Sequence, residues 1–534
     1  MATLPAKPQY AAGAWALAVL MTVIAAARIV STYDVFNQTS DEPFHIAAGM
    51  ELLDRGVYSY EAQHPPLARV ATAIGPYMLG RRSQGETDGR SEGKAILLGG
   101  GDPIRNLAAA RSGILPFFVV ATLVVWLWAK RLGGLFAALV AVLLFTTLPP
   151  VLAHSGLATN DAAVMAFVAA GVWAFARWLE SPRIGSAALV GACWSLAILS
   201  KLSALLYLPV SAVAALALWG IGRHTGRLDA NRVSPSVIVK HGLVAGLVGF
   251  GLIWSCYRWS VTFPSKLGGL VPVPAFELFR GVQALFEHNA SGHLAYLLGE
   301  TSQTGWWYFF PVAIAVKTPL PFLFLTLIGA WVSLRKAYRD RDWSLPIPIV
   351  TSVAILLAVM PININIGLRY ILPIFPALSV VGGTGAVALW NNSTLRPVAR
   401  VSLVALLAWL VIDTTRAHPD YLAYFNETVR QRANPVLIDS DLDWGQDFYR
   451  LVAEVERRRI DNIAVAFWGS VDFVKQGARG MRKLKPNERP AGWVAASELY
   501  RSGLAGPGFD WLKQEKPVAR IGKTVSLYYF PPVP

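Results

Sequence analysis

Two adjacent carboxylates, Asp41 and Glu42, follow the first long apolar run of the chain by about ten residues. A carboxylate held near a low-dielectric boundary can have a raised pKa and act as a general base. The alternative interpretation is that Ser40, Asp41 or Glu42 caps a helix that begins at Pro43. Asp161, at the start of a later apolar run, presents the same choice. Two acids facing one cavity at the membrane surface would be costly unless they were paired or used in chemistry.

Three basic residues, Lys201, Lys317 and Arg369, are expected at the same membrane level as these acids. Phosphate is the natural partner of a cation near lipid, because both lysine and arginine recognise it well. The alternative for a lysine is that its side chain snorkels to the interface. From the residues alone, we favour snorkelling for Lys201 and phosphate binding for Arg369, where the nearby Gly367 allows close approach of the backbone.

Three further residues could support such a site. His64 precedes the rigid Pro65-Pro66 pair, Arg69 follows it, and His154 stands in the short turn that ends at Asp161. His64 could bind a metal or shuttle a proton, although a lone histidine is more often only a hydrogen-bonded residue. The sequence shows no His/Cys/Asp/Glu cluster with metal-ligand spacing, no phosphate-binding glycine-rich loop and no Ser-His-Asp signature.

The elements that must position these residues are membrane-spanning helices. Of the 534 residues, 54% are hydrophobic and 15% are charged, whereas a soluble chain carries about 25% charged residues. About eleven runs can span a bilayer at ~20 residues per span. They lie near 11–31, 113–129, 134–152, 161–179, 184–200, 203–220, 241–259, 318–334, 344–360, 370–390 and 399–415.

The charge distribution predicts the orientation of the chain. The net charge of +15 comes from basic residues placed between apolar runs, not in one stripe, so we do not expect a nucleic-acid partner. With the N-terminus in the cytoplasm, the short inner segments carry most of the positive charge, as the positive-inside rule requires. Examples are Lys130, Arg131, Arg335, Lys336, Arg396 and Arg400. An odd number of spans then places the C-terminal tail outside the cell.

We therefore expect a polytopic α-helical membrane domain over residues 1–415 and an extracytoplasmic soluble α/β domain over 416–534. Two outer loops are long, at about 32–112 and 260–305, and loops of this size usually contain short helices or have a function. In the first, helices are expected from Pro43 to Gly56 and from Pro66 onward, and 81–101 is expected to be a mobile loop. The tail should contain a helix over 447–459 and strands near 462–468, 492–496 and 524–529.

The order of these motifs resembles that of the GT-C membrane glycosyltransferases. The phospholipid-carrier-dependent group is the most similar, with its bacterial relatives of the protein O-mannosyltransferases and the lipid A aminoarabinose transferases. The resemblance rests on the acidic pair after the first span, on His64–Arg69 and on Asp161. Further matching stretches are 317–321, 367–370, 418–426 and 439–447. The eukaryotic carbohydrate-binding insertion of the protein mannosyltransferases has no counterpart in the tail.

The resemblance implies a polyprenyl-phosphate sugar donor, of a hexosyl (mannosyl) or pentosyl type, and a protein, lipid or glycan acceptor that approaches from the outside of the plasma (inner) membrane. The base of the inverting reaction maps onto Asp41 or Glu42, and we favour Asp41. Asp161 matches a second acidic position that orients the acceptor or a cation. Arg369, with Lys201 or Lys317, would stabilise the lipid phosphate as it leaves.

Some GT-C members use a divalent metal, and the sequence does not decide this point. A competing hypothesis is a transporter or flippase of a lipid-linked substrate. It predicts charges near the middle of the membrane and broken helices in paired halves, which are not found.

Overall fold

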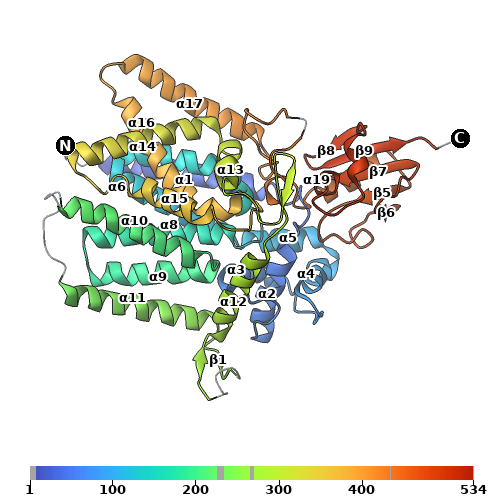
Figure 1. The fold of residues 1–534 in the computed structure, drawn as a ribbon, viewed down its shortest axis with the longest axis horizontal. Coiled ribbons are helices and arrows are strands. Elements are labelled where there is room, and N and C mark those ends of the chain that lie inside the picture. Colours follow the sequence, from blue (N-terminus) through green and yellow to red (C-terminus); the bar gives the residue numbers. More distant parts are fainter. Residues whose placement is uncertain (1–7, 225–233, 265–269, 433, 533–534) are drawn as a thin grey trace.

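The computed structural model describes residues 8–224, 234–264, 270–432 and 434–532, and its main feature is a bundle of long apolar helices (Figure 1). Eight helical segments are long and apolar enough to cross a membrane, and α9 and α15 are shorter apolar helices of the same bundle. The bundle helices are α1 (Pro8–Val30), α6 (Leu115–Thr147), α8 (Asp161–Glu180), α9 (Ile184–Ser200), α10 (Ala204–His224), α11 (Pro235–Cys256), α14 (Leu320–Asp340), α15 (Ile347–Val359), α16 (Phe375–Trp390) and α17 (Arg396–Arg416).

Helix α6 is two spans joined by a tight reversal at Gly134, which has a φ of 78°. The rings of Phe118 and Phe145 stack with their centroids 5.9 Å apart, although the same separation along a straight helix would be about 40 Å. The predicted division into spans near 113–129 and 134–152 is therefore confirmed. When the two halves of α6 are counted separately, the described residues contain eleven apolar bundle helices.

Small residues allow the central helix α16 to approach its neighbours closely. A Cβ atom on Gly383 would collide with the carbonyl oxygen of Ala137 in α6, and one on Gly385 would collide with that of Leu325 in α14. Apolar helices pack in lipid mainly through such van der Waals contact, and small residues at the interface make it possible. This packing buries α16 in the centre of the bundle.

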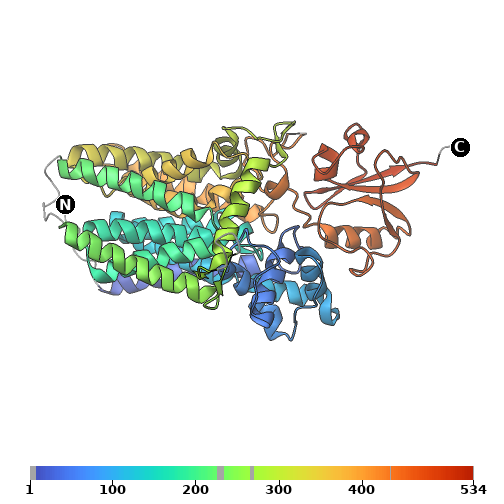
Figure 2. The same ribbon diagram turned by 60° about the horizontal axis from the view of Figure 1, so that its bottom comes forward.

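The first long loop forms four helices at the end of the bundle that lies away from the N-terminus (Figure 2). They are α2 (Glu42–Arg55), α3 (Pro66–Met78), α4 (Gly89–Leu98) and α5 (Pro103–Ser112). The predicted helices at Pro43 and Pro66 are confirmed, and α2 ends at Gly56 in the left-handed conformation. The expectation of a loop over 81–101 holds for 81–88 and is wrong for 89–98, which form α4; Asp88 caps this helix by accepting hydrogen bonds from the amides of Arg90 and Ser91.

The second long loop also contains its own elements. The hairpin β1 (Val261–Thr262) and β2 (Val273–Pro274) and the helix α12 (Phe276–Ser291) project beside the end of α11 (Figure 1). A second hairpin, β3 (Ala295–Leu297) and β4 (Glu300–Ser302), leads to α13 (Phe309–Lys317). The turn before Asp161 carries the short helix α7 (Pro149–Ser155), and the segment before α16 forms a 3-10 helix, η3 (Leu368–Ile374).

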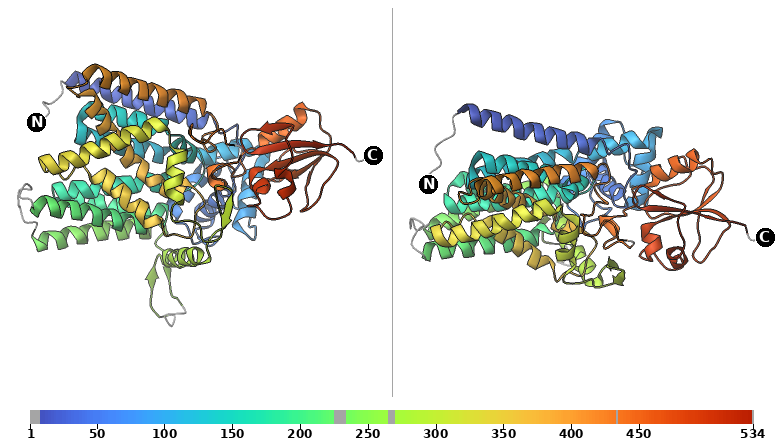
Figure 3. Two further views of the ribbon diagram at one scale, coloured as in Figure 1. Left: turned by 45° about the horizontal axis from the view of Figure 1, so that its top comes forward. Right: turned by 90° about the horizontal axis from the view of Figure 1, so that it is seen from above.

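The tail folds into an α/β unit at the opposite end of the bundle from the N-terminus (Figures 1 and 3). Its five-stranded sheet has the order β6-β5-β7-β9-β8. Strand β5 runs parallel to both of its neighbours, β6 and β7. Strand β9 runs antiparallel to both of its neighbours, β7 and β8. The bounds are η4 (Asp439–Asp441), α18 (Phe448–Arg457), β5 (Ile463–Ala466), β6 (Met481–Lys483), β7 (Gly492–Ser497), α19 (Glu498–Ser502), η5 (Asp510–Lys513), β8 (Ala519–Ile521) and β9 (Val525–Phe530).

The predicted helix and three strands of the tail correspond to α18, β5, β7 and β9. No pattern in the sequence indicates β6 or β8. Each is an edge strand of three residues, too short for the alternation of apolar and polar side chains to be recognised.

Candidate functional site

A cavity of about 350 Å³ opens where the first-loop helices, α12 and the η3 segment meet at the tail end of the bundle. Five of the nine residues singled out in the sequence line it, namely Asp41, His64, Arg69, Lys201 and Arg369. They come from segments that are far apart in the chain, so the fold brings the predicted acids and cations together at one place.

The acids and cations of the cavity form a chain of ion pairs. Arg369 Nη1 lies 3.0 Å from Asp41 Oδ2 and 4.0 Å from Asp161 Oδ2. Lys201 Nζ lies 2.7 Å from Asp161 Oδ1. The side chain of Asp41 is 34% exposed, whereas that of Asp161 is fully buried behind the cations. Of these two acids, Asp41 is thus the one that a molecule in the cavity can reach, and Asp161 balances the charge of the cations beneath it.

The capping interpretation does not apply to these two acids. Asp41 occupies the N-cap position of α2, but its side chain makes no capping hydrogen bond. Asp161 is the first residue of α8, whose N-cap, Asn160, also makes no side-chain cap. The carboxylates of Asp41 and Asp161 are turned toward Arg369 and Lys201 instead.

Arg369 is held in place by the tail. Its guanidinium lies over the indole of Trp444, 4.3 Å from the ring centroid. The amide of the preceding residue, Leu368, donates to the carboxylate of Asp441 over 3.0 Å, and Ser440 Oγ donates to the carbonyl of Ile366. A side chain at position 367 would collide with Ser440, which is why this close approach requires glycine.

The tail also holds the segment that carries Asp41. The Asn37 amide donates to the carbonyl of Gly445 over 2.7 Å, and its oxygen accepts from the amide of Phe448 over 2.7 Å. The amide of Ser40 donates to the carbonyl of Trp444 over 3.0 Å. The same short stretch of the tail therefore fixes both sides of the pair formed by Asp41 and Arg369.

Glu42 lies outside the cavity, in a buried ion pair with Arg111. The two Arg111 nitrogens Nε and Nη2 lie 2.8 and 2.9 Å from its carboxylate oxygens, and the amides of Thr39 and Ala158 donate to it as well. Burial works against ionisation here, but Arg111 and these hydrogen bonds hold the pKa of Glu42 below its usual range. Glu42 is an anchor of the first loop, and of the two predicted bases only Asp41 faces the cavity.

Lys317 is also placed outside the cavity, contrary to the predicted role in phosphate binding. Its ammonium donates to the carbonyl of Leu422 over 2.7 Å and to that of Asp441, and it lies over the ring of Phe425. Burial lowers the pKa of this ammonium to about 8. Lys317 therefore ties the start of the tail to the bundle.

His154 lies behind Asp161, with Nδ1 3.8 Å from Asp161 Oδ2 and its ring against Trp444. Burial lowers the pKa of His154 to about 4, so the ring is neutral at physiological pH. The pKa of His64, which lines the cavity, is likewise lowered by burial and by the charge of Arg69. Neither histidine adds positive charge near the two cations.

Arg69 is fully buried and organises the loop around the cavity. Its guanidinium pairs with Glu61, donates to Tyr58 Oη over 3.1 Å and donates to His45 Nδ1 over 3.1 Å. Arg69 was predicted as a supporting residue, whereas its partners Glu61, Tyr58 and His45 were not. The only sequence feature that pointed to Glu61 was its position just before the proline pair. That feature does not distinguish a buried ion-pair partner of Arg69 from an acidic residue of a solvated loop.

The donor set of the described residues does not fit a metal ion. No group of three or more His, Cys, Asp or Glu side chains in these residues is arranged to hold one. In addition, Lys201 occupies one oxygen of Asp161, and Arg369 occupies one oxygen of Asp41.

Comparisons with known proteins agree with this architecture. Residues 58–254 match the family model described as dolichyl-phosphate-mannose-protein mannosyltransferase. None of the curated proteins matches the chain.

Among solved structures, ArnT from Cupriavidus metallidurans in the apo state aligns with a TM-score of 0.51 at 14% identity, over 97% of this chain and 98% of that one. The oligosaccharyltransferase of Archaeoglobus fulgidus with a tethered acceptor peptide gives 0.47 at 12% identity, over 93% of this chain and 72% of that one. The S. cerevisiae protein O-mannosyltransferase complex Pmt1-Pmt2 gives 0.34 at 19% identity, over 48% and 34%. The family-model match and the fold shared with ArnT confirm the predicted resemblance, and the chain has the fold of the GT-C membrane glycosyltransferases.

Proposed function

We propose that the chain is an inverting glycosyltransferase that moves a sugar from a polyprenyl-phosphate donor to an acceptor hydroxyl on the outer face of the membrane. The observation that carries this proposal is the cavity in which Asp41, exposed to the interior, lies 3.0 Å from Arg369 and close to Lys201. The matching family model, named for a lipid-phosphate-linked sugar donor, supports the same class of substrate.

The chemistry needs a site for the leaving phosphate and a base for the acceptor. Arg369 and Lys201 would bind the phosphate and stabilise the negative charge that it gains as the bond to the sugar breaks. A bound phosphate competes with Asp41 for Arg369, which leaves the carboxylate free to act as a base. Asp161, which contacts both cations, keeps them charged and in position.

In the transfer step, the acceptor oxygen attacks the anomeric carbon from the face opposite the phosphate, while its proton passes to Asp41. The bond between the anomeric carbon and the phosphate oxygen breaks, and its electrons remain on the phosphate. A single displacement of this kind inverts the anomeric centre. It requires base and leaving group on opposite faces of the sugar.

The site lies at the tail end of the bundle, opposite the N-terminus (Figure 2). We place the protein in the plasma (inner) membrane with its N-terminus in the cytoplasm. The cavity and the tail then face outward, where a protein, lipid or glycan acceptor can reach them. The charge asymmetry between the two ends of the bundle supports this orientation.

The proposal is tested in liposomes that contain the purified protein and radiolabelled polyprenyl-phosphate mannose or aminoarabinose, with a panel of peptide and lipid acceptors. We expect transfer by the wild type and a loss of about 100-fold or more in Asp41→Asn, the usual scale for removing a general base. Equal transfer by both proteins contradicts the role of Asp41. Movement of the donor lipid across the bilayer without any transferred sugar would instead favour a flippase.

A further inference from the structure

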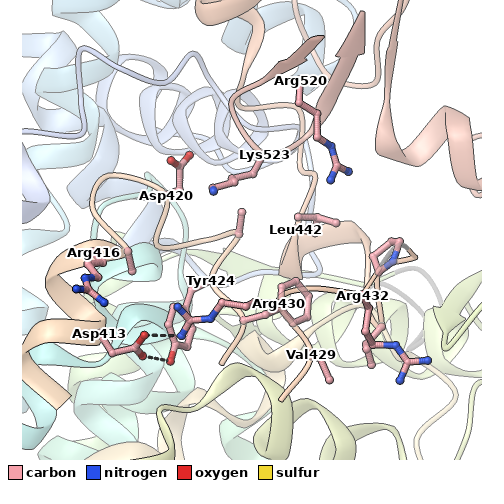
Figure 4. A pocket seen from close by; sticks show the side chains of 15 residues that line it. Asp413, Arg416, Asp420, Tyr424, Val429, Arg430, Arg432, Leu442, Arg520 and Lys523 are labelled. Atoms are coloured by element: carbon pink, nitrogen blue, oxygen red, sulfur yellow. Dashed lines mark hydrogen bonds and ion pairs between the residues drawn. The ribbon is translucent and has the colours of Figure 1, made fainter. Parts of the chain in front are cut away.

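A second pocket, of about 260 Å³, lies where the last span meets the tail (Figure 4). Its walls are the end of α17, residues of the connecting segment within 417–432 and 435–436, and β8 with the turn that follows it. No residue lines both this pocket and the cavity that contains Asp41. The pocket is therefore a separate feature, and we call it the α17 pocket.

The α17 pocket is strongly cationic. Arg416, Arg432 and Lys523 line it, are exposed, and have no ion-pair partner among the described residues. A fourth cation, Arg520, shares Glu498 with Arg501 and keeps half of its side chain exposed. Figure 4 shows these cations around the opening, on three separate segments of the chain. An anion bound among these like charges would be stabilised by all of them.

The two acids of the α17 pocket do not neutralise these cations, because each already has a partner. Asp413 is buried and accepts from Tyr424 Oη and from Arg430, both over 2.5 Å. Asp420 accepts from Arg450 over 2.6 Å. The pairs in which Asp413 takes part also fix one wall of the pocket.

The outer surface of α17 leads directly to this pocket. Val401, Val404, Val411 and Ile412 form an exposed apolar stripe along the helix, and Arg416 lies one turn beyond Ile412 on the same face. Such a stripe on a spanning helix faces the acyl chains of lipids. A lipid that lies along it places its headgroup at Arg416, within reach of the other cations.

We propose that the α17 pocket binds the phosphate of an anionic membrane lipid whose acyl chains lie along α17. Arginine and lysine together supply the charge and hydrogen-bond donors that a phosphodiester or phosphomonoester group requires. The site takes the lipid from the leaflet on the tail side of the bilayer. It does not depend on glycosyl transfer, because no residue of the site near Asp41 takes part in it.

The test compares lipid retention by the full-length protein. Wild type and the triple variant Arg416→Gln, Arg432→Gln, Lys523→Gln are purified from mixed micelles of phosphatidylglycerol and phosphatidylcholine, and native mass spectrometry counts the bound lipids. The control variant Lys475→Gln, Lys485→Gln, Lys516→Gln removes the same charge from exposed positions of the tail outside the pocket. Thermal melting verifies that all three proteins are folded.

We expect the wild type and the control to retain phosphatidylglycerol in preference to phosphatidylcholine, and the triple variant to bind it about tenfold or more weakly. Equal retention in all three proteins would overturn the proposal. A further arm adds inorganic phosphate. Binding of inorganic phosphate without any preference for phosphatidylglycerol would show a soluble anion site, and this result also overturns the assignment to a lipid. A failure of the transferase assay leaves these binding results unaffected.

Discussion

The guanidinium of Arg369 lies over the indole of Trp444, 4.3 Å from the ring centroid, and this contact joins the membrane bundle to the soluble tail. Arg369 lies in η3, directly before α16, whereas Trp444 lies in the tail after α17. The tail therefore supports the candidate site from behind, through Arg369, although none of its residues lines the cavity. Its 439–447 stretch places the cation that would bind the donor phosphate.

Replacing Trp444 with leucine should weaken the proposed transfer. A cation–π contact contributes about 0.5–2 kcal/mol, which corresponds to roughly a 2- to 30-fold change in kcat/KM. We expect most of this change in the KM for the donor, because Arg369 loses its orientation. Trp444→Phe should give an intermediate value, and Trp511→Leu, a change elsewhere in the tail, should have little effect. Identical kinetics in Trp444→Leu and wild type would contradict the positioning role.

The neighbouring acids Asp41 and Glu42 should behave in opposite ways. Glu42→Gln leaves Arg111 buried without its charge partner, which costs about 3–5 kcal/mol of unfolding free energy. Asp41→Asn changes a side chain that is partly exposed, so the Tm should change little, whereas transfer should fall about 100-fold or more because the general base is lost. Thermal melting and the transfer assay on both variants check this. A stable Glu42→Gln protein would be inconsistent with the anchoring role.

Asp161 and Lys201 should be coupled. Asp161→Asn leaves the ammonium of Lys201, 2.7 Å away, without its main counter-charge and should lower the Tm and the affinity for polyprenyl phosphate. In the double variant Asp161→Asn, Lys201→Met, the Tm should recover while transfer stays low. A double-mutant cycle on Tm measures the coupling, which for contacting charges is about 0.5–3 kcal/mol. If the changes in Tm of the two single variants add up to that of the double variant, Asp161 and Lys201 are not coupled.

Asp439 should make stability depend on pH. Burial, together with the charge of Asp41, raises its pKa to about 7 against the attraction of Arg369. An unfolded aspartate has a pKa of about 3.9, so between about pH 4 and 7 the folded protein binds one more proton than the unfolded chain. The free energy of unfolding therefore falls as the pH rises through that window.

Asp439→Asn removes this titration and tolerates the positive φ of 49° at this position. The Tm of the variant should therefore rise relative to the wild type between pH 4 and pH 8. The control Asp510→Asn, at an exposed position of the tail, should show no such trend. A difference in Tm that stays constant with pH would rule out a raised pKa at Asp439.

Labelling of introduced cysteines should establish the orientation. Lys475→Cys is exposed in the tail, and Arg396→Cys is exposed at the other end of the last span. In intact cells or right-side-out vesicles, a membrane-impermeant maleimide should label the first and not the second. The reverse pattern would place the proposed site on the cytoplasmic side.

Much of the fold could be predicted because lipid imposes a simple rule on the sequence. Apolar runs of spanning length fixed the number of bundle helices, and even the reversal at Gly134 followed from the basic pair Lys130-Arg131. By contrast, α4 was missed because its polar composition is that of a loop, and only the cap at Asp88 reveals the helix. Composition predicts burial well and local capping poorly.

The site was predictable in its residue types but not in its pairings. Asp41, Asp161, Lys201 and Arg369 could be selected because charges near a membrane surface are rare and need a reason. Asp41 and Glu42 have different roles because Glu42 pairs with Arg111, which lies 69 residues after it in the chain. The role of Trp444 depends on contacts with the first loop and with η3. Pairings across such distances in sequence follow from the tertiary fold, and no local pattern encodes them.

The hydrogen bonds between Asn37 and the tail have a consequence for biogenesis. Asn37 is synthesised more than 400 residues before Gly445 and Phe448, its two partners. The segment that carries Asp41 therefore cannot form these bonds until the last span has been synthesised and the tail has folded. A nascent or prematurely terminated chain can occupy the membrane, but it cannot hold Asp41 opposite Arg369. The site can therefore assemble only after the tail has been synthesised.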